Sequence, residues 1–444
     1  MPRPRPGRRT ALALVLAAVL LGAAGLVAAV VAGGDGAPAG EGAAAADPLG
    51  HPGTPRRGGE ARTLYRIPAP RVPRAGVDIP GFWVRDGYVV KTVRAAVVAY
   101  ADDGAEKWRI PLPHRICAAP RTETGGKAVI AYQGGAERGC DRITLIDLVR
   151  GVKLWDRPVP GPGGGHPALH LAQSGDLVGL AWIGGSGLVR IGDGGQIAAE
   201  EPGPVCSVQG FAGGAALLRS YTCGDGTARL QRLDTATGAV AWTYPLRGGY
   251  TVDRIYSTSP VVVAVRNERT RRTAVLSLTE RGERRAVLDL GRTEYLPRCP
   301  MDLYGSDVDG CQGVAATADT CYLPTAMDRH GGGLTNQIHA FDLRTGRRRW
   351  AVRAPGRLLY PLGTQGRALL AYQAAGYDRP GAVVRIGPGG GRPSTVLRHP
   401  TAARHVESGF YSARYAYRDG RFYLASDRLT GSGADETLLV AFGP

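Results

Sequence analysis

Lysine and the common catalytic motifs are scarce or absent in this chain of 444 residues. Of its 55 basic residues only four are lysines, namely Lys91, Lys107, Lys127 and Lys153. The formal net charge of +17 could serve a nucleic-acid or anionic-lipid surface. No basic run in the body of the chain is long enough to follow a nucleic-acid backbone, however. We therefore interpret the charge as a compositional bias toward arginine and alanine, and expect no nucleic-acid partner.

Sequence signals for known chemistry are also missing. No C-x-x-C pair is present, which argues against a zinc site, and neither a G-x-S-x-G elbow nor a G-x-G-x-x-G loop occurs. His166 and His170 would lie ~13 Å apart on a strand, too far to share an ion, so we expect a surface pair. Residues 307–311 (DVDGC) lack the further acidic ligands of a calcium loop, so we expect a solvated insertion. We assign no catalytic residue, cofactor or metal ligand.

The N-terminus combines a basic segment with a long apolar run. Residues 1–10 contain four arginines, and residues 11–32 contain no charged residue. At ~1.5 Å per residue this run spans about 33 Å, enough for a bilayer core of about 30 Å. The arginines predict a cytoplasmic tail, a single-pass signal anchor in the cell membrane and an extracytoplasmic body. A cleaved signal peptide is the alternative, although its apolar region is usually only about 7–15 residues.

Residues 33–60 are rich in glycine, alanine and proline and have few large apolar side chains. Such a segment cannot bury a core, so we predict a flexible linker. Residues 61–444 then form the folded body.

The body repeats a strand, a tight turn and a tryptophan. The clearest copy is AFDLRTGRRRW, residues 340–350. The turn glycines of the four strong copies are Gly104, Gly151, Gly238 and Gly346, and the tryptophans four residues later are Trp108, Trp155, Trp242 and Trp350. The glycines are 47, 87 and 108 residues apart. Degenerate copies fill the two longer gaps, at Gly194 and Gly282, and a third follows Gly346, at Gly390 or Gly391.

One copy of the repeat has a direct physical interpretation. Its aspartate can hydrogen-bond the turn backbone, and its glycine supplies the positive φ of a tight hairpin. A tryptophan at a fixed register on each outer strand needs a fixed apolar slot, which a neighbouring sheet of the same kind would supply. A period of 40–50 residues with room for four short strands is typical of a β-propeller blade.

The two ends of the body predict how the ring closes. Residues 438–444 (LLVAFGP) match the third strand of a unit, and no tryptophan strand follows them. Residues 63–70 (TLYRIPAP) match that missing strand, with Tyr65 at the place of the tryptophan. Closure by this strand would leave no open sheet edge. We therefore predict an all-β, eight-bladed propeller with tryptophan-docking repeats, its blades ending near residues 113, 160, 204, 247, 290, 355, 398 and 444.

The core pattern Asp-x-x-Thr-Gly-x-x-x-Trp, present in residues 340–350 and 233–242, resembles the docking repeat of PQQ-like (quinoprotein alcohol dehydrogenase-like) propellers. That superfamily includes quinone-dependent dehydrogenases and a non-enzymatic lipoprotein that assists outer-membrane protein assembly. The resemblance covers the body and implies the fold, but a shared fold does not imply a shared function. The enzymes usually carry a vicinal cysteine pair and an acidic calcium site. This sequence has no adjacent cysteines, so no catalytic residue is transferred.

Seven cysteines suit an oxidising, extracytoplasmic compartment. Their positions on the expected blades bring two pairs to one end of a sheet, and a cysteine in the longest insertion can loop back to a third partner. We predict the disulfides Cys117–Cys140, Cys206–Cys223 and Cys299–Cys311. Cys321 falls on an inward strand position, so we expect a free buried thiol.

We expect a membrane-anchored, extracytoplasmic propeller that acts as a non-catalytic binding or scaffold module for a protein or cell-envelope partner. Two alternatives remain open. One is a quinone-dependent dehydrogenase-like enzyme, and the other is a sensor that holds a small ligand in the central funnel.

Overall fold

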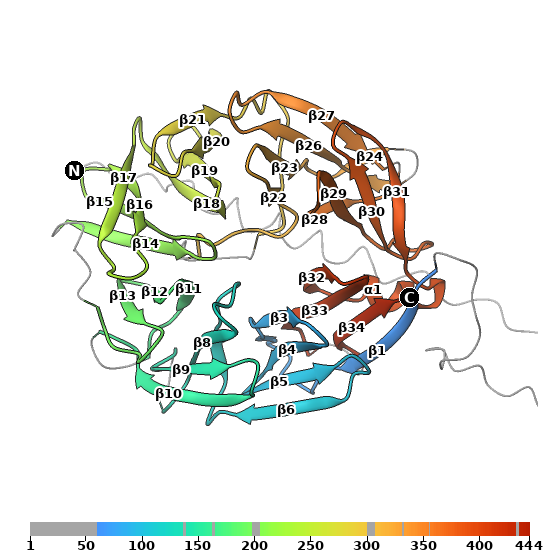
Figure 1. The fold of residues 1–444 in the computed structure, drawn as a ribbon, viewed down its shortest axis with the longest axis horizontal. Helices are drawn as coiled ribbons and strands as arrows, with labels where there is room; N and C mark the ends of the chain where they lie inside the picture. Colours follow the sequence, from blue (N-terminus) through green and yellow to red (C-terminus); the bar gives the residue numbers. More distant parts are fainter. Residues whose placement is uncertain are drawn as a thin grey trace, which may run out of the picture. The chain divides into compact units, whose positions relative to one another are not determined.

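Eight antiparallel sheets form a closed ring in the computed structural model (Figure 1). The structure describes residues 60–135, 139–161, 165–197, 205–299, 307–330, 333–354, 356–431 and 435–444. In sheets one to seven the first strand along the chain lies toward the middle of the ring and the last lies at the outside, whereas in sheet eight β32 lies toward the middle and β1 at the outside (Figure 1). The predicted eight-bladed β-propeller is therefore confirmed.

The sheets are numbered in chain order. Sheets one to five consist of β3 (Phe82–Arg85), β4 (Tyr88–Val93), β5 (Ala96–Ala101) and β6 (Glu106–Pro111); β7 (Ile116–Ala118), β8 (Lys127–Tyr132), β9 (Arg142–Asp147) and β10 (Val152–Pro158); β11 (His170–Ser174), β12 (Leu177–Trp182) and β13 (Gly185–Arg190); β14 (Cys206–Ala212), β15 (Leu217–Cys223), β16 (Ala228–Leu233) and β17 (Val240–Leu246); and β18 (Tyr250–Thr258), β19 (Val261–Asn267), β20 (Thr273–Leu278) and β21 (Arg284–Val287).

Sheets six to eight consist of β22 (Ala315–Ala316), β23 (Thr320–Pro324), β26 (Gln337–Asp342) and β27 (Arg348–Arg353); β28 (Leu359–Gln365), β29 (Ala368–Gln373), β30 (Ala382–Gly387) and β31 (Gly390–Arg398); and β32 (Ser412–Arg418), β33 (Arg421–Leu429), β34 (Thr437–Gly443), β1 (Arg62–Pro68) and β2 (Val77–Asp78). A separate hairpin, β24 (Asp328–His330) and β25 (Gly333–Thr335), extends sheet six, and a helical turn, η1 (Thr401–Ala403) with α1 (Arg404–Ser408), precedes β32.

Strand composition follows position in the ring. The middle strands are almost continuously apolar and buried on both faces, as in β12 and β19, because a sheet lies against each face. The outer strand β17 alternates between exposed and half-buried residues, because one of its faces meets solvent. The core is therefore distributed between adjacent sheets around the ring.

Ring closure occurs as predicted. Strand β1 pairs antiparallel with β34, with Arg62 opposite Gly443 and Tyr65 opposite Ala441. The N-terminal strand thus becomes the outermost strand of sheet eight. Sheet three differs from the expected four strands: its described residues form three strands, followed by an isolated bridge between Val189 and Gln196.

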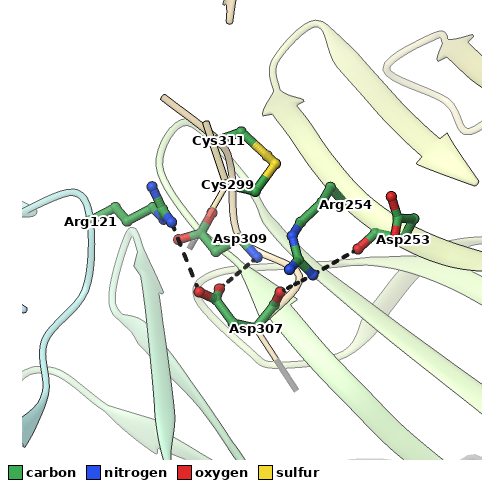
Figure 2. The surroundings of a disulfide bond; sticks show 7 residues. All are labelled: Arg121, Asp253, Arg254, Cys299, Asp307, Asp309 and Cys311. Carbon is green, nitrogen blue, oxygen red and sulfur yellow. Dashed lines mark hydrogen bonds and ion pairs between the residues drawn. A yellow bond between two sulfur atoms is a disulfide. The ribbon is translucent and has the colours of Figure 1, made fainter. Parts of the chain in front are cut away.

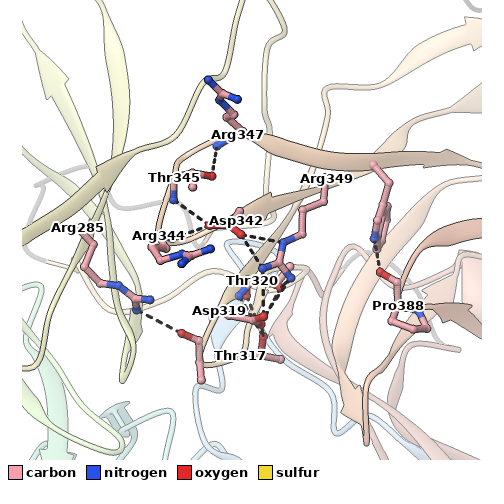
Figure 3. Close-up of polar contacts among 12 residues, drawn as sticks. Arg285, Thr317, Asp319, Thr320, Asp342, Arg344, Thr345, Arg347, Arg349 and Pro388 are labelled. Atoms are coloured by element: carbon pink, nitrogen blue, oxygen red, sulfur yellow. Dashed lines mark hydrogen bonds and ion pairs between the residues drawn. The ribbon is translucent and has the colours of Figure 1, made fainter.

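The turn chemistry also agrees with the prediction (Figure 3). The carboxylate of Asp342 accepts hydrogen bonds from the backbone N–H groups of Arg344 and Thr345 at 2.9 and 2.8 Å. Gly346 has a φ of 74°, and its N–H donates to the Asp342 carbonyl at 2.8 Å. A hydrogen bond from Arg349 holds the pKa of Asp342 below its usual range, so this turn keeps its negative charge.

Aromatic rings of one sheet lie against turn glycines of the next. A Cβ added to the glycine would come within 2.5–3.1 Å of the ring in five pairs, which are Tyr65 with Gly104, Trp108 with Gly151, Trp155 with Gly194, Trp242 with Gly282 and Trp350 with Gly390. Three indole N–H groups also donate to backbone carbonyls of the next sheet, those of Trp155 to Ile191, Trp242 to Glu280 and Trp350 to Pro388. Any larger residue at these turns would displace the ring.

Two turns of the repeat have no ring beside them. Gly238 faces Ile197, and Gly346 faces the backbone of Val287, because the described parts of sheets three and five carry no aromatic residue at that register. That the rings act as energetic docking elements stays a prediction, which stability measurements can test.

The predicted tail, membrane span and linker (residues 1–10, 11–32 and 33–60) lie outside the described residues except for Glu60. Within the described ranges, no helix has the length and apolar character needed to cross a membrane.

Replacing Trp155 by alanine should lower the free energy of unfolding by about 3–5 kcal/mol, since the ring is only 8% exposed and its loss leaves a cavity between two sheets. Denaturant unfolding measures the change. Tyr377→Ala, at a side chain 90% exposed, is the matched control and should shift stability by less than about 0.5 kcal/mol. Equal small effects of both substitutions would contradict the docking role.

Candidate binding sites at the ring centre and on sheet six

All three predicted disulfides are present. Cys117 is joined to Cys140, Cys206 to Cys223, and Cys299 to Cys311. Cys321 is free and buried, and burial raises the pKa of its thiol to about 12. An unreactive thiol of this kind has a packing role.

The segment between β21 and β22 reaches the inside of the ring, so the expected solvated insertion at residues 307–311 is wrong. Asp309 forms a parallel bridge with Ile255 on the inner strand β18. The Ile255 N–H donates to the Val308 carbonyl at 2.8 Å, and the Gly310 N–H donates to the Ile255 carbonyl at 2.9 Å. These backbone bonds hold the segment inside, and the Cys299–Cys311 disulfide closes the loop that carries it.

Charged side chains from several sheets meet around Asp307 (Figure 2). Its carboxylate lies 3.9 Å from both Arg121, which belongs to the loop between β7 and β8, and His170 of β11. Arg254 of β18 donates to the Asp307 carbonyl at 2.6 Å, and the Asp309 N–H donates to the Asp307 carboxylate at 3.1 Å. Residues from sheets two, three and five thus converge on the inserted segment.

Asp309 has the most perturbed carboxyl group of this cluster. Burial raises its pKa to about 7, and the neighbouring Asp307 carboxylate adds to the rise, while Arg121 and Arg414 oppose it. Asp309 therefore titrates near neutral pH. Sequence reasoning missed this, because nothing in DVDGC indicates burial.

A cavity of about 570 Å³ adjoins the cluster. Its walls come from the inner strands of sheets one and eight, the loop between β7 and β8, and the inserted segment; the lining residues are Phe82, Trp83, Val84, Arg121, Thr122, Glu123, Gln312, Arg414, Tyr415, Ala416, Tyr417 and Arg418. We call it the central groove. Burial lowers the pKa of Arg414 to about 10, so this guanidinium stays cationic at neutral pH.

A second hollow lies on sheet six, where the chain adds material to the repeat. The added segments carry exposed apolar side chains: Leu296 and Met327 are each 54% exposed, and Leu334 on β25 is 48% exposed. The Leu296 N–H donates to the Pro324 carbonyl at 3.2 Å, and the Ala326 N–H donates to the Glu294 carbonyl at 2.8 Å. We call Leu296, Met327 and Leu334 the sheet-six surface. Met327 also lines an adjacent hollow of about 390 Å³.

The polar residues of this hollow centre on His339. Its Nδ1 lies 2.7 Å from the Tyr295 hydroxyl, and burial together with the nearby Arg348 charge lowers its pKa to about 4. The imidazole is therefore neutral at physiological pH. The His339 ring therefore holds the Tyr295 hydroxyl in place and adds no charge to the wall of the hollow.

The expectation that His166 and His170 both lie on the surface is wrong for His166. His166 is buried, with its ring centroid 4.4 Å from that of Trp182, because the backbone bonds that it exchanges with Cys140 draw it under the second sheet. His170 is partly exposed and faces Asp307. The described residues hold no group of three potential metal ligands.

Sequence reasoning missed the residues of the central groove altogether. Arg121, Gln312 and Arg414 belong to three different sheets or connections and share no motif, so only the closed ring brings them together. The one available signal was the length of the insertion before β22.

No family model matches the sequence, and no curated protein matches it. Among solved structures, BamB from Moraxella catarrhalis is 16% identical with a TM-score of 0.46, over 86% of this chain and 97% of that one. Quinohemoprotein alcohol dehydrogenase from Comamonas testosteroni is 10% identical with a TM-score of 0.45, over 87% of this chain and 76% of that one. Both are PQQ-like β-propellers. At these values the likeness concerns the fold alone, and carries no argument about function.

Substituting Asp309 by asparagine should change the pH dependence of stability. The folded carboxyl keeps its proton up to a pKa of about 7, whereas the unfolded one releases it near its ordinary pKa of about 4. Between these values the native state binds more protons, so the wild-type free energy of unfolding falls as pH rises. We expect the melting temperature of Asp309→Asn to rise relative to that of wild type between about pH 4 and pH 7.

Asp378→Asn, at an exposed carboxylate, is the control and should follow wild type across this range. Parallel curves for Asp309→Asn and wild type would contradict the burial of the Asp309 carboxyl.

Proposed function

We propose that this protein is a non-catalytic binding or scaffold module whose propeller lies outside the cytoplasm, anchored to the cell membrane by residues 11–32. Its partner is a protein, and the sheet-six surface is the contact region. The exposed apolar side chains on the additions to sheet six are the observation that carries this proposal.

Three features of the sheet-six surface support protein binding. It belongs to segments that the repeat does not require, namely the insertion before β22 and the β24–β25 hairpin. It exposes three large apolar side chains, one of which, Met327, lines a hollow, and exposed apolar surface is a property of interaction sites. The rigid ring beneath holds these segments in place, which lowers the entropy lost on binding.

The extracytoplasmic location is supported by the three disulfides, which persist in oxidising compartments. The four arginines before the apolar run favour a cytoplasmic N-terminus. Together they support a propeller on the far side of the membrane.

A photocrosslinking amino acid at Met327 should capture the partner in intact cells, and Leu334→Asp should abolish that adduct by placing a charge in the apolar contact. The crosslinker at Tyr377, an exposed aromatic position outside the sheet-six surface, is the control and should not capture the same partner. Gel shift and mass spectrometry detect the adduct. Capture at Tyr377 but not at Met327 would overturn the assignment of the contact region.

Thiol labelling tests the compartment. Protein isolated from its native cell, denatured without reductant, should bind one maleimide at Cys321, and after reduction it should bind seven, one per cysteine. Intact mass gives the number of labels. Seven labels before reduction would show that the chain matured in a reducing compartment and would contradict the extracytoplasmic location.

A further inference from the structure

The central groove concentrates unsatisfied polar atoms. Four buried side-chain atoms of its lining make no hydrogen bond within the described part of the chain: Trp83 Nε1, Arg121 Nη2, Gln312 Oε1 and Tyr415 Oη. Each such group costs about 1–3 kcal/mol. Four of them on the walls of one groove indicate a polar occupant that would satisfy donors and an acceptor together.

The charge of the groove favours an anionic group. The Arg414 guanidinium makes no hydrogen bond or ion pair with any residue that the structure describes, and the contact of Arg121 with Asp307 is long, at 3.9 Å. The only carboxylate on the wall, Glu123, already accepts from Arg85 and from the Gly126 N–H. Two guanidinium groups are therefore available for a carboxylate, the group that they bind best in bidentate geometry.

Charged groups that do not line the groove also interact with these arginines. Asp307, Asp309 and Asp427 attract Arg414, and its charge disfavours the ionised form of buried Lys91. Arg418, at the other end of the lined stretch of β32, is already paired with Asp86 at 2.5 Å. The unpaired positive charge thus lies at the Arg414 end of the groove.

The length of the groove suits a short extended peptide. Residues 414–418 of β32 line it in sequence, and at ~3.3 Å per residue they cover about 13 Å. An extended segment of about four residues has the same length.

Backbone and side chains along β32 are available to such a chain. Among the described residues β32 pairs with β33 alone, so its other edge faces inward. Residues Ser412–Tyr417 are all partly exposed, and Phe82, Trp83 and Tyr417 add aromatic surface to the walls. An added peptide strand would gain main-chain hydrogen bonds from this edge.

We propose that the central groove binds the C-terminal end of an extended peptide, whose terminal carboxylate contacts Arg121 and Arg414 and whose last residues lie along β32. This site is formed by sheets one, two and eight with the inserted segment. The site is distinct from the sheet-six surface. It gives the molecule a second binding activity, specific for the C-terminal end of a peptide, beyond the proposed scaffold role.

The test uses the purified full-length protein and a degenerate library of acetylated tripeptides, prepared once with free C-terminal carboxylates and once as C-terminal amides. Equilibrium dialysis with mass spectrometry measures retention. We expect members of the carboxylate library to bind about tenfold or more tightly than their amides, since a hydrogen bond to a charged group contributes about 1.5–3 kcal/mol. Phenylacetate, a small carboxylate without a peptide backbone, should bind more weakly than the best tripeptides.

Substitutions locate the binding in the groove. Arg414→Gln should weaken the best tripeptide about tenfold, whereas Arg392→Gln, at an exposed arginine on β31, should leave its affinity unchanged. Tyr415→Phe removes one hydroxyl with little risk to folding and should weaken the same tripeptide by a smaller factor. If Arg414→Gln does not fold, Tyr415→Phe decides the location.

Equal retention of acids and amides, or no retention of either, would overturn the proposal. Phenylacetate binding as tightly as the best tripeptide would show a small-molecule site instead. Crosslinking at Met327 tests the sheet-six surface and not the central groove. The proposed function and the peptide site can therefore fail independently.

Discussion

The pairing of β1 with β34 is the constraint on which the rest of the molecule depends. Every sheet buries its middle strands on both faces, so each needs a neighbour on either side. Only a closed ring provides that for all eight. The strand that completes sheet eight comes from the start of the body, with Tyr65 opposite Ala441. Its ring then covers Gly104 of sheet one, so one strand both seals an edge and joins the last sheet to the first.

The candidate binding residues belong mainly to segments that depart from the repeat. The aspartate–glycine turns and the rings beside them recur with small changes around the ring and leave few free groups. The insertion before β22 supplies Asp307, Asp309 and Gln312 to the centre, and Leu296 to the sheet-six surface. A rigid ring tolerates such additions because its core lies between sheets, and long connections cost little further entropy.

Charge is arranged differently inside and outside the ring. On the surface, arginines pair with turn carboxylates, as Arg349 does with Asp319 and Asp342, and these contacts are screened by solvent. At the centre, burial raises the pKa of Asp309 to about 7, and the Arg414 guanidinium has no hydrogen-bond partner among the described residues. The centre therefore combines a carboxyl group that titrates near neutral pH with an arginine that can meet an incoming carboxylate.

The sequence by itself determined the fold class, the number of sheets, the closing strand and all three disulfides. Each of these follows from local patterns repeated at a fixed period: a turn glycine, an aspartate, a ring and cysteines at the ends of strands. It did not determine the buried course of residues 307–311, the burial of His166 or the central groove. Those depend on contacts between different repeats or connections, such as His166 with Trp182 and Arg121 with Asp307, which carry no periodic signal. Only closure of the ring decided which side chains meet at its centre, because closure sets the distances between sheets that are remote in the chain.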